Sequence, residues 1–159
     1  MLKQLMQRLG RYRVIMDRSD NEPYLERYYV FLKDRRWFPF NIFLHRFLKS
    51  DPGHPHDHPW AFCTIILRGG YWEWRPVLDN IGRPLGERVE WKGAGSIRFG
   101  HARDLHRVEL EPGVTPWTLF IPGPKFRDWG FLVGHRWVPH DEYFGLRSKC
   151  WQGVYCPRW

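Results

Sequence analysis

Three of the eight histidines in this sequence, His54, His56 and His58, occupy alternating positions in one short segment. In an extended chain, residues two apart lie on the same face, so two of these imidazoles can close on a single ion. Neutral imidazole binds divalent first-row metals without adding charge to the site. Residues 53–60 therefore predict a metal site whose remaining ligands come from elsewhere in the chain.

The composition indicates the scaffold that holds this segment. The chain has 159 residues, the size of one ordinary domain, and such a domain needs neither a disulfide nor a metal merely to fold. Aromatic residues make up 18% of the chain, which also has 15 glycines and 13 prolines. We expect one domain over residues 1–159, with a core barrel over about 24–139 and a tail over 140–159.

The order of apolar and turn-forming residues predicts the elements. Helical spacing of apolar residues predicts a short helix over 1–9. The apolar run 60–67 predicts a strand buried on both faces, and the turn after it suggests a hairpin with residues 71–75. Residues 78–87 read as a loop. Roughly ten short strands in all indicate an all-β sandwich or barrel.

Charge and cysteine content limit the partners. The net charge is +8, but the arginines are scattered and show no nucleic-acid-binding signature, so we expect no nucleic-acid partner. The three cysteines, Cys63, Cys150 and Cys156, fit a reducing compartment, and Cys150 and Cys156 are close enough to pair if oxidised. No secretory or membrane-spanning segment is evident, so we expect a cytoplasmic protein without membrane contact.

The histidine spacing resembles that of cupins, a superfamily of small β-barrels that place metal ligands inside the barrel. Their first motif runs His-x-His, three or four residues, usually Glu, six residues and Gly. Here His56-Asp57-His58 is followed after four residues by Cys63 and after six more by Gly70. The resemblance implies a cupin barrel (a double-stranded β-helix or jelly roll) with a short N-terminal helix.

The second cupin motif contributes one histidine from a later strand pair, and His106 is the match in this chain. The resemblance thus implies a metal site formed by His56, His58 and His106. His54 and His101 are secondary candidates.

Cys63 stands where most cupins have Glu, and this narrows the comparison. The thiol dioxygenases of the cysteine dioxygenase type are similar in having Cys there, and they share His-Asp-His and a Leu-x-Gly that matches residues 67–69. The chain departs from them at 119–122, where they have a cross-linked Tyr, and at Val30, where they have a carboxylate-binding Arg. Uncharacterised small cupins of bacteria and phages also share the His-Asp-His-Pro-Trp segment.

The resemblance implies a three-histidine non-haem Fe(II) oxygenase that acts on a small anionic substrate, thiols included. Zinc, nickel or manganese would suit three histidines nearly as well. Without Glu at position 63 the site is all-histidine, unless Asp57 or Glu73 swings in. Strand alternation points Asp57 away, where it would orient a ligand ring by a hydrogen bond.

The remaining candidates follow from this chemistry. Cys63 and Asp57 are the catalytic candidates, and Arg98, Arg107 and Arg127 are the candidates that would hold the anion. The alternative is a cupin of another class, either a non-redox enzyme such as an isomerase or epimerase or a non-catalytic protein that binds a small ligand. Cupins often pair through edge strands, so a homodimer is also an expectation.

Overall fold

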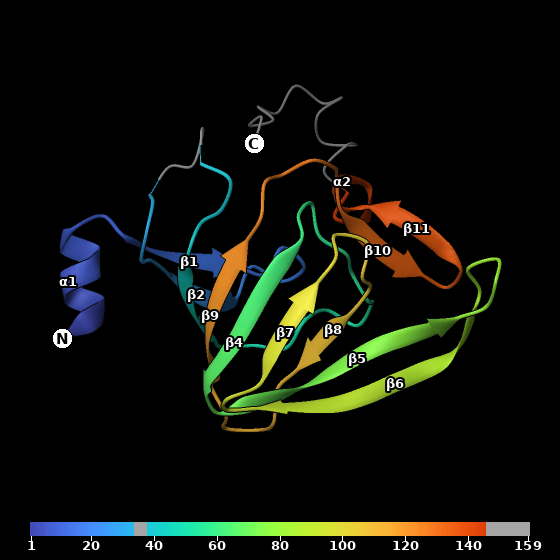
Figure 1. Cartoon of the computed structure of the whole chain (residues 1–159), viewed down its shortest axis with the longest axis horizontal. Coiled ribbons are helices and arrows are strands. Elements are labelled where there is room, and N and C mark those ends of the chain that lie inside the picture. Colours follow the sequence, from blue (N-terminus) through green and yellow to red (C-terminus); the bar gives the residue numbers. More distant parts are fainter. Residues whose placement is uncertain (34–37, 146–159) are drawn as a thin grey trace.

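The computed structural model describes residues 1–33 and 38–145 (Figure 1). The suggested pair Cys150 and Cys156 lies outside the described residues. The helices and strands, in chain order, are α1 (Leu2–Arg8), β1 (Tyr12–Met16), β2 (Pro23–Tyr29), β3 (Phe43–Phe47), β4 (Phe62–Arg68), β5 (Gly70–Leu78), β6 (Pro84–Gly93), β7 (Ile97–Gly100), β8 (Arg107–Glu109), β9 (Trp117–Pro122), β10 (Gly130–Val133), β11 (Arg136–Pro139) and α2 (His140–Tyr143).

The strands form a barrel-like arrangement of antiparallel sheets. The largest sheet has the order β1-β2-β3-β9-β4-β7, and two smaller ones have the orders β6-β5-β8 and β10-β11. The histidine segment lies between the two smaller sheets, because the backbone of His56 forms isolated bridges with His106 and with Phe131. These bridges join β6-β5-β8, the histidine segment and β10-β11 into one layer (Figure 1).

The expected mostly β fold with a short N-terminal helix is confirmed. Alternation along β4 shows how the sequence builds it: Phe62, Thr64 and Ile66 are buried, while Cys63 and Ile65 between them are half-buried. The inner side chains therefore belong to one face of the sheet. The prediction that this strand is buried on both faces was wrong, because the residues between them lie on the outer face.

Two further expectations about the strands were wrong. β4 and β5 do not form a hairpin: β4 pairs with β7 and β9, whereas β5 pairs with β6 and β8. Gly69, with φ of +72°, turns the chain from one sheet into the other. The predicted loop over 78–87 is half strand, because β5 extends to Leu78 and β6 begins at Pro84, and the loop itself is confined to residues 79–83 of a long hairpin (Figure 1).

None of the helices among the described residues is long and apolar enough to cross a membrane.

Candidate metal centre

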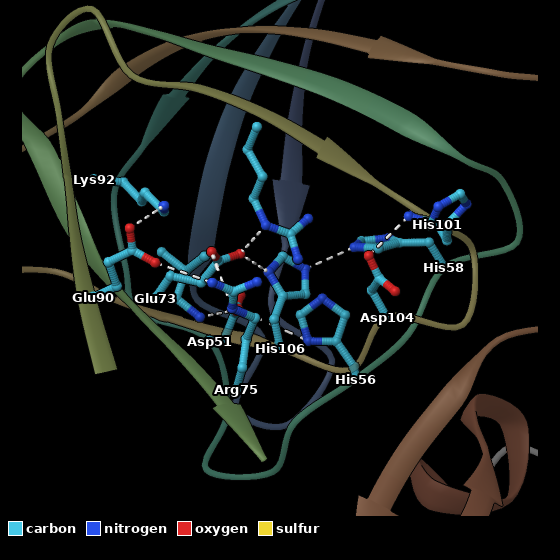
Figure 2. A network of polar contacts seen from close by, with 12 residues as sticks. Asp51, His56, His58, Glu73, Arg75, Glu90, Lys92, His101, Asp104 and His106 are labelled. Carbon is cyan, nitrogen blue, oxygen red and sulfur yellow. Dashed lines mark hydrogen bonds and ion pairs between the residues drawn. The ribbon is translucent and has the colours of Figure 1, made fainter. Parts of the chain in front are cut away.

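His56, His58 and His106 come together inside the barrel, with one ligand nitrogen of each within 4.8 Å of the others (Figure 2). The backbone positions them: His56 and His106 exchange two hydrogen bonds, His56 N to His106 O at 2.8 Å and His106 N to His56 O at 3.0 Å. His58 shares a face with His56, two residues away, and its Nε2 lies 2.8 Å from Nε2 of His106. A pairing across fifty residues thus completes the set that the first motif begins.

His106 is held by a buried carboxylate. Its Nδ1 lies 2.9 Å from Oε1 of Glu73, a residue on β5 with no exposed surface (Figure 2). An imidazole whose Nδ1–H donates to a carboxylate keeps a lone pair on Nε2, the nitrogen that faces His58. Glu73 therefore fixes the ring orientation and tautomer that metal binding requires.

Glu73 is itself held by two arginines. The Arg98 guanidinium contacts the same Oε1 that His106 uses, and Arg75 Nε lies 3.7 Å from Oε2. Arg98 is buried and its guanidinium lies over the ring of Phe62, at 5.0 Å from the centroid. The buried carboxylate of Glu73 therefore lies between the His106 imidazole and two guanidinium groups.

Burial keeps two of the histidines neutral. The pKa of His58 lies well below its usual value, first because of burial and then because of the positive charge of the neighbouring histidines and Arg98. The pKa of His106 is lowered for the same reasons, burial first and then His56, Arg98 and Arg75. Both rings therefore keep a lone pair at neutral pH, which is the form that binds a metal.

His56 differs because its Nδ1 is buried and has no hydrogen-bond partner among the described residues. Oδ2 of Asp51 lies 3.8 Å from this nitrogen. Asp51 accepts hydrogen bonds from the Tyr24 hydroxyl and from the backbone N–H of Val108, so its position is fixed. A carboxylate is thus also placed behind this second imidazole.

The three side chains fit a first-row metal ion. Two nitrogens bound at right angles to one ion, each at about 2.0–2.1 Å, are separated by about 2.9 Å. The Nε2 atoms of His58 and His106 already have nearly this separation, 2.8 Å. The donor set is therefore three imidazoles, two of them backed by carboxylates, and Glu73 acts behind His106 instead of entering the cluster.

Asp57 points away from the cluster, as strand alternation predicts, but it does not orient a ligand ring. Its carboxylate accepts hydrogen bonds from Arg127 Nη1 at 2.6 Å, from the Gly130 backbone at 2.8 Å and from Trp137 Nε1 at 3.0 Å. These partners lie on β10, β11 and the segment before them. The role expected for Asp57 is therefore corrected: it fastens the histidine segment to the β10-β11 hairpin.

Cys63 is placed on the outer face of β4, opposite the inward-facing Phe62. Phe62 packs on two of the histidines, with ring centroids 4.7 Å from His58 and 5.9 Å from His106. Burial raises the pKa of the Cys63 thiol. The thiol therefore does not face the cluster, and Phe62 is the neighbouring side chain on β4 that does.

Of the three candidate arginines, only Arg98 lies beside the cluster. Arg107 stacks over Trp74 at 4.2 Å and contacts Glu109, while Arg127 binds Asp57. The structure does not bring these two to the histidines. The expectation that Arg98, Arg107 and Arg127 together hold an anion was therefore wrong, because they lie in different places.

The two secondary histidines are outside the cluster. His54 Nδ1 lies 2.9 Å from the Tyr143 hydroxyl and so connects the histidine segment to α2. His101 is exposed, and its backbone N–H donates to Asp104 in the bend before His106 (Figure 2).

The motifs did not predict that Glu73 and Asp51 lie beside the ligand histidines as parts of the site. A lone Glu in the run Tyr-Trp-Glu-Trp is a signal, since a carboxylate among aromatic residues in a strand has to be paired when buried. Nothing in the sequence identifies its partner, because β5 meets β8 only in the folded barrel.

No family model and no curated protein matches the sequence. Among solved structures, the polyketide cyclase RemF from Streptomyces resistomycificus is similar, with 18% identity over 85% of this chain and 93% of that one and a TM-score of 0.54. Fe(II)-HppE, solved with the alternative substrate (S)-1-HPP, has 13% identity over 72% of this chain and a TM-score of 0.51. The match covers 57% of the HppE chain. A cupin domain from Bordetella pertussis has 12% identity over 64% of this chain and 95% of its own, with a TM-score of 0.45. At such identities the likeness shows the fold alone.

Proposed function

We propose that this chain is a metal-dependent enzyme whose His56, His58 and His106 hold a divalent first-row transition metal, Fe(II) first among them. The observation that carries the proposal is the convergence of three ligand nitrogens within 4.8 Å inside the barrel. The lowered pKa values of His58 and His106 support it, because protonated imidazoles cannot bind a metal.

The finer part of the proposal is an oxygenase that acts on a small molecule. A bound Fe(II) would supply open coordination positions at which substrate and dioxygen meet. The chain's own residues would orient His106 through Glu73, exclude water with Phe62 and keep two imidazoles neutral by burial. Of the three candidate arginines, Arg98 alone lies beside the histidines, and there it pairs with Glu73.

Metal analysis of protein purified from iron-supplemented cells tests the proposal. We expect about one metal ion per chain in the wild type and loss of that ion in His58→Ala and His106→Ala. His101→Ala is the matched control, because this exposed histidine lies outside the cluster. A wild type without stoichiometric metal, or metal that persists in His106→Ala, would contradict the proposal.

The reaction class is tested separately in the iron-loaded protein. Oxygen uptake is measured with a panel of thiols, amino acids, 2-oxoacids and ring-containing acids, the thiols being included because of the resemblance at the His-Asp-His motif. Uptake that depends on His106 supports the oxygenase. Stoichiometric metal with substrate turnover in the absence of oxygen would favour the non-redox cupin enzyme instead.

A further inference from the structure

A cavity of about 180 Å³ lies beside His56, which is one of its lining residues. The end of β1, the turn after it, the histidine segment, β10 and the residue after α2 surround it. His56 is the one member of the histidine cluster that lines this cavity. A molecule in the cavity therefore contacts the candidate metal centre through His56.

The walls of the cavity are mainly apolar. Trp129, Phe131 and Phe144 form an aromatic side, and Ile15 and Met16 lie on β1. These aromatic rings pack on one another and on His56. The ring centroid of Phe131 lies 5.8 Å from that of His56 and 5.5 Å from that of Trp129, and the centroid of Phe144 lies 5.4 Å from that of Phe131. Such walls suit a flat apolar body.

The carboxylates that border the cavity are already engaged within the chain. Asp51 accepts from the Tyr24 hydroxyl and the Val108 backbone, and Asp17 accepts from Ser19 and pairs with Lys49 at 3.1 Å. Both carboxylates therefore have partners within the chain and do not require a cationic ligand. Arg18 also lines the cavity, and its guanidinium lies over the Phe144 ring at 5.7 Å from the centroid, so one cation borders walls that are otherwise mainly apolar.

The volume sets the size of the occupant. A buried apolar cavity of about 150 Å³ accommodates benzene, and this cavity measures about 180 Å³. A six-membered ring with a small substituent matches this volume. An acyclic anion would leave the aromatic walls uncovered.

We propose that the cavity beside His56 is the substrate site and that it takes a single-ring, largely apolar molecule whose polar substituent points toward His56. This rests on the proposed function for the reacting centre, but the binding of the ring rests on the cavity walls alone. Experiments can therefore contradict the proposed metal centre and the binding of a ring in the cavity independently of each other.

The test measures binding of benzoate and benzyl alcohol, with acetate and malonate as acyclic anions, by calorimetry on the full chain. Both ring compounds are expected to bind and both acyclic anions to show no saturable binding. In Ile15→Trp the indole fills the cavity, and ring binding is expected to weaken about tenfold or more. The matched control is Ile97→Trp, at a position that is 58% exposed on β7 and remote from the cavity.

Two further measurements keep the outcomes distinct. Metal-free His58→Ala is expected to bind benzyl alcohol within about threefold of the wild type, because His58 does not line the cavity. Loss of metal with retained ring binding therefore separates this inference from the proposed function. In the wild type, intermolecular NOEs are expected between ring protons and the Ile15 and Met16 methyl groups, which requires no variant.

The inference is overturned by any of three results. These are absence of ring binding, binding of acetate or malonate in preference to the ring compounds, and ring binding in a folded Ile15→Trp that equals the wild type.

Discussion

Nδ1 of His106 lies 2.9 Å from Oε1 of Glu73, and the same oxygen contacts Arg98. The buried Glu73 carboxylate thus contacts both the candidate metal ligand His106 and the buried Arg98 guanidinium. Because Glu73 both orients the imidazole and neutralises a guanidinium, its replacement has two separable effects.

The first effect is on metal affinity. Glu73→Gln removes the charge that fixes the His106 tautomer, and loss of such a carboxylate weakens metal binding by about 10–100-fold. Competition with a chromogenic chelator measures the affinity. Glu90→Gln is the control, because Glu90 contacts Arg75 and Lys92 but no histidine. Equal affinities for the two variants would show that Glu73 does not tune the site.

The second effect is on stability. Glu73→Gln leaves the Arg98 guanidinium buried without a carboxylate, which costs about 3–5 kcal/mol of the free energy of unfolding. Adding Arg98→Met removes the uncompensated charge, so the double variant is expected to recover most of the loss. Urea unfolding with chelator present measures both. If the double variant is no more stable than Glu73→Gln, the pair is not a coupled unit.

Asp57 is expected to matter for stability. Asp57→Ala frees Arg127, the Gly130 backbone and Trp137, and breaking a buried pair of this kind costs about 3 kcal/mol or more. Hydrogen exchange is expected to accelerate first in β10 and β11, where these partners lie. Uniform acceleration over the whole barrel would contradict a role confined to this junction.

Cys63→Ala is expected to leave the metal content unchanged, because the side chain lies on the outer face of β4. Replacing a half-buried thiol by a methyl group changes the free energy of unfolding by about 1 kcal/mol or less. Metal analysis and urea unfolding check both statements. Loss of metal in this variant would place the thiol at the cluster after all.

The pH dependence of stability can be predicted from His45, a buried histidine outside the cluster. Burial, followed by the charge of Arg27, holds its pKa well below the usual value. Below a pH of about 6.5 the unfolded chain takes up a proton that folded His45 does not, so stability falls as pH falls, by up to about 1.4 kcal/mol per pH unit. Above that pH both states are neutral and the effect vanishes.

His45→Gln should lessen this loss, because glutamine does not titrate and can still accept from Arg27 Nε, 3.0 Å from His45 Nε2. Unfolding midpoints in urea at pH 7.5 and 5.5, with chelator present, give the comparison. The exposed His101→Gln is the control. An unchanged pH dependence in His45→Gln would rule out His45 as the source.

The histidine spacing carried the sequence prediction far because its logic is local. His56 and His58 share a face whatever the rest of the chain does, and the alternation that unites them also turns Asp57 away. His106, in contrast, came from the resemblance to the second cupin motif and not from local spacing. Turn residues and aromatic strands, which are local signals, predicted an all-β sandwich or barrel, and the resemblance to cupins selected the barrel.

The rest depended on long-range pairing. Counting four residues from His58 selects Cys63, but β4 begins at Phe62 and alternation puts the cysteine outside. The partner of Glu73 is decided by the register in which Glu73 opposes Val108, two residues from His106. The cavity beside His56 is formed by segments more than one hundred residues apart, which no periodicity reveals.

The isolated bridges of His56 have a mechanical consequence. Among the described residues, the sheet that contains β5 and β8 is joined to β10 through the histidine segment, by the two isolated bridges of His56. His56 and His106 are the two partners of one of these bridges, so an ion bound by both side chains would add a second link between the histidine segment and the sheet that contains β8. A bound metal would then lower the rate at which the histidine segment, together with the β10-β11 hairpin paired with it, opens locally from the sheet that contains β8.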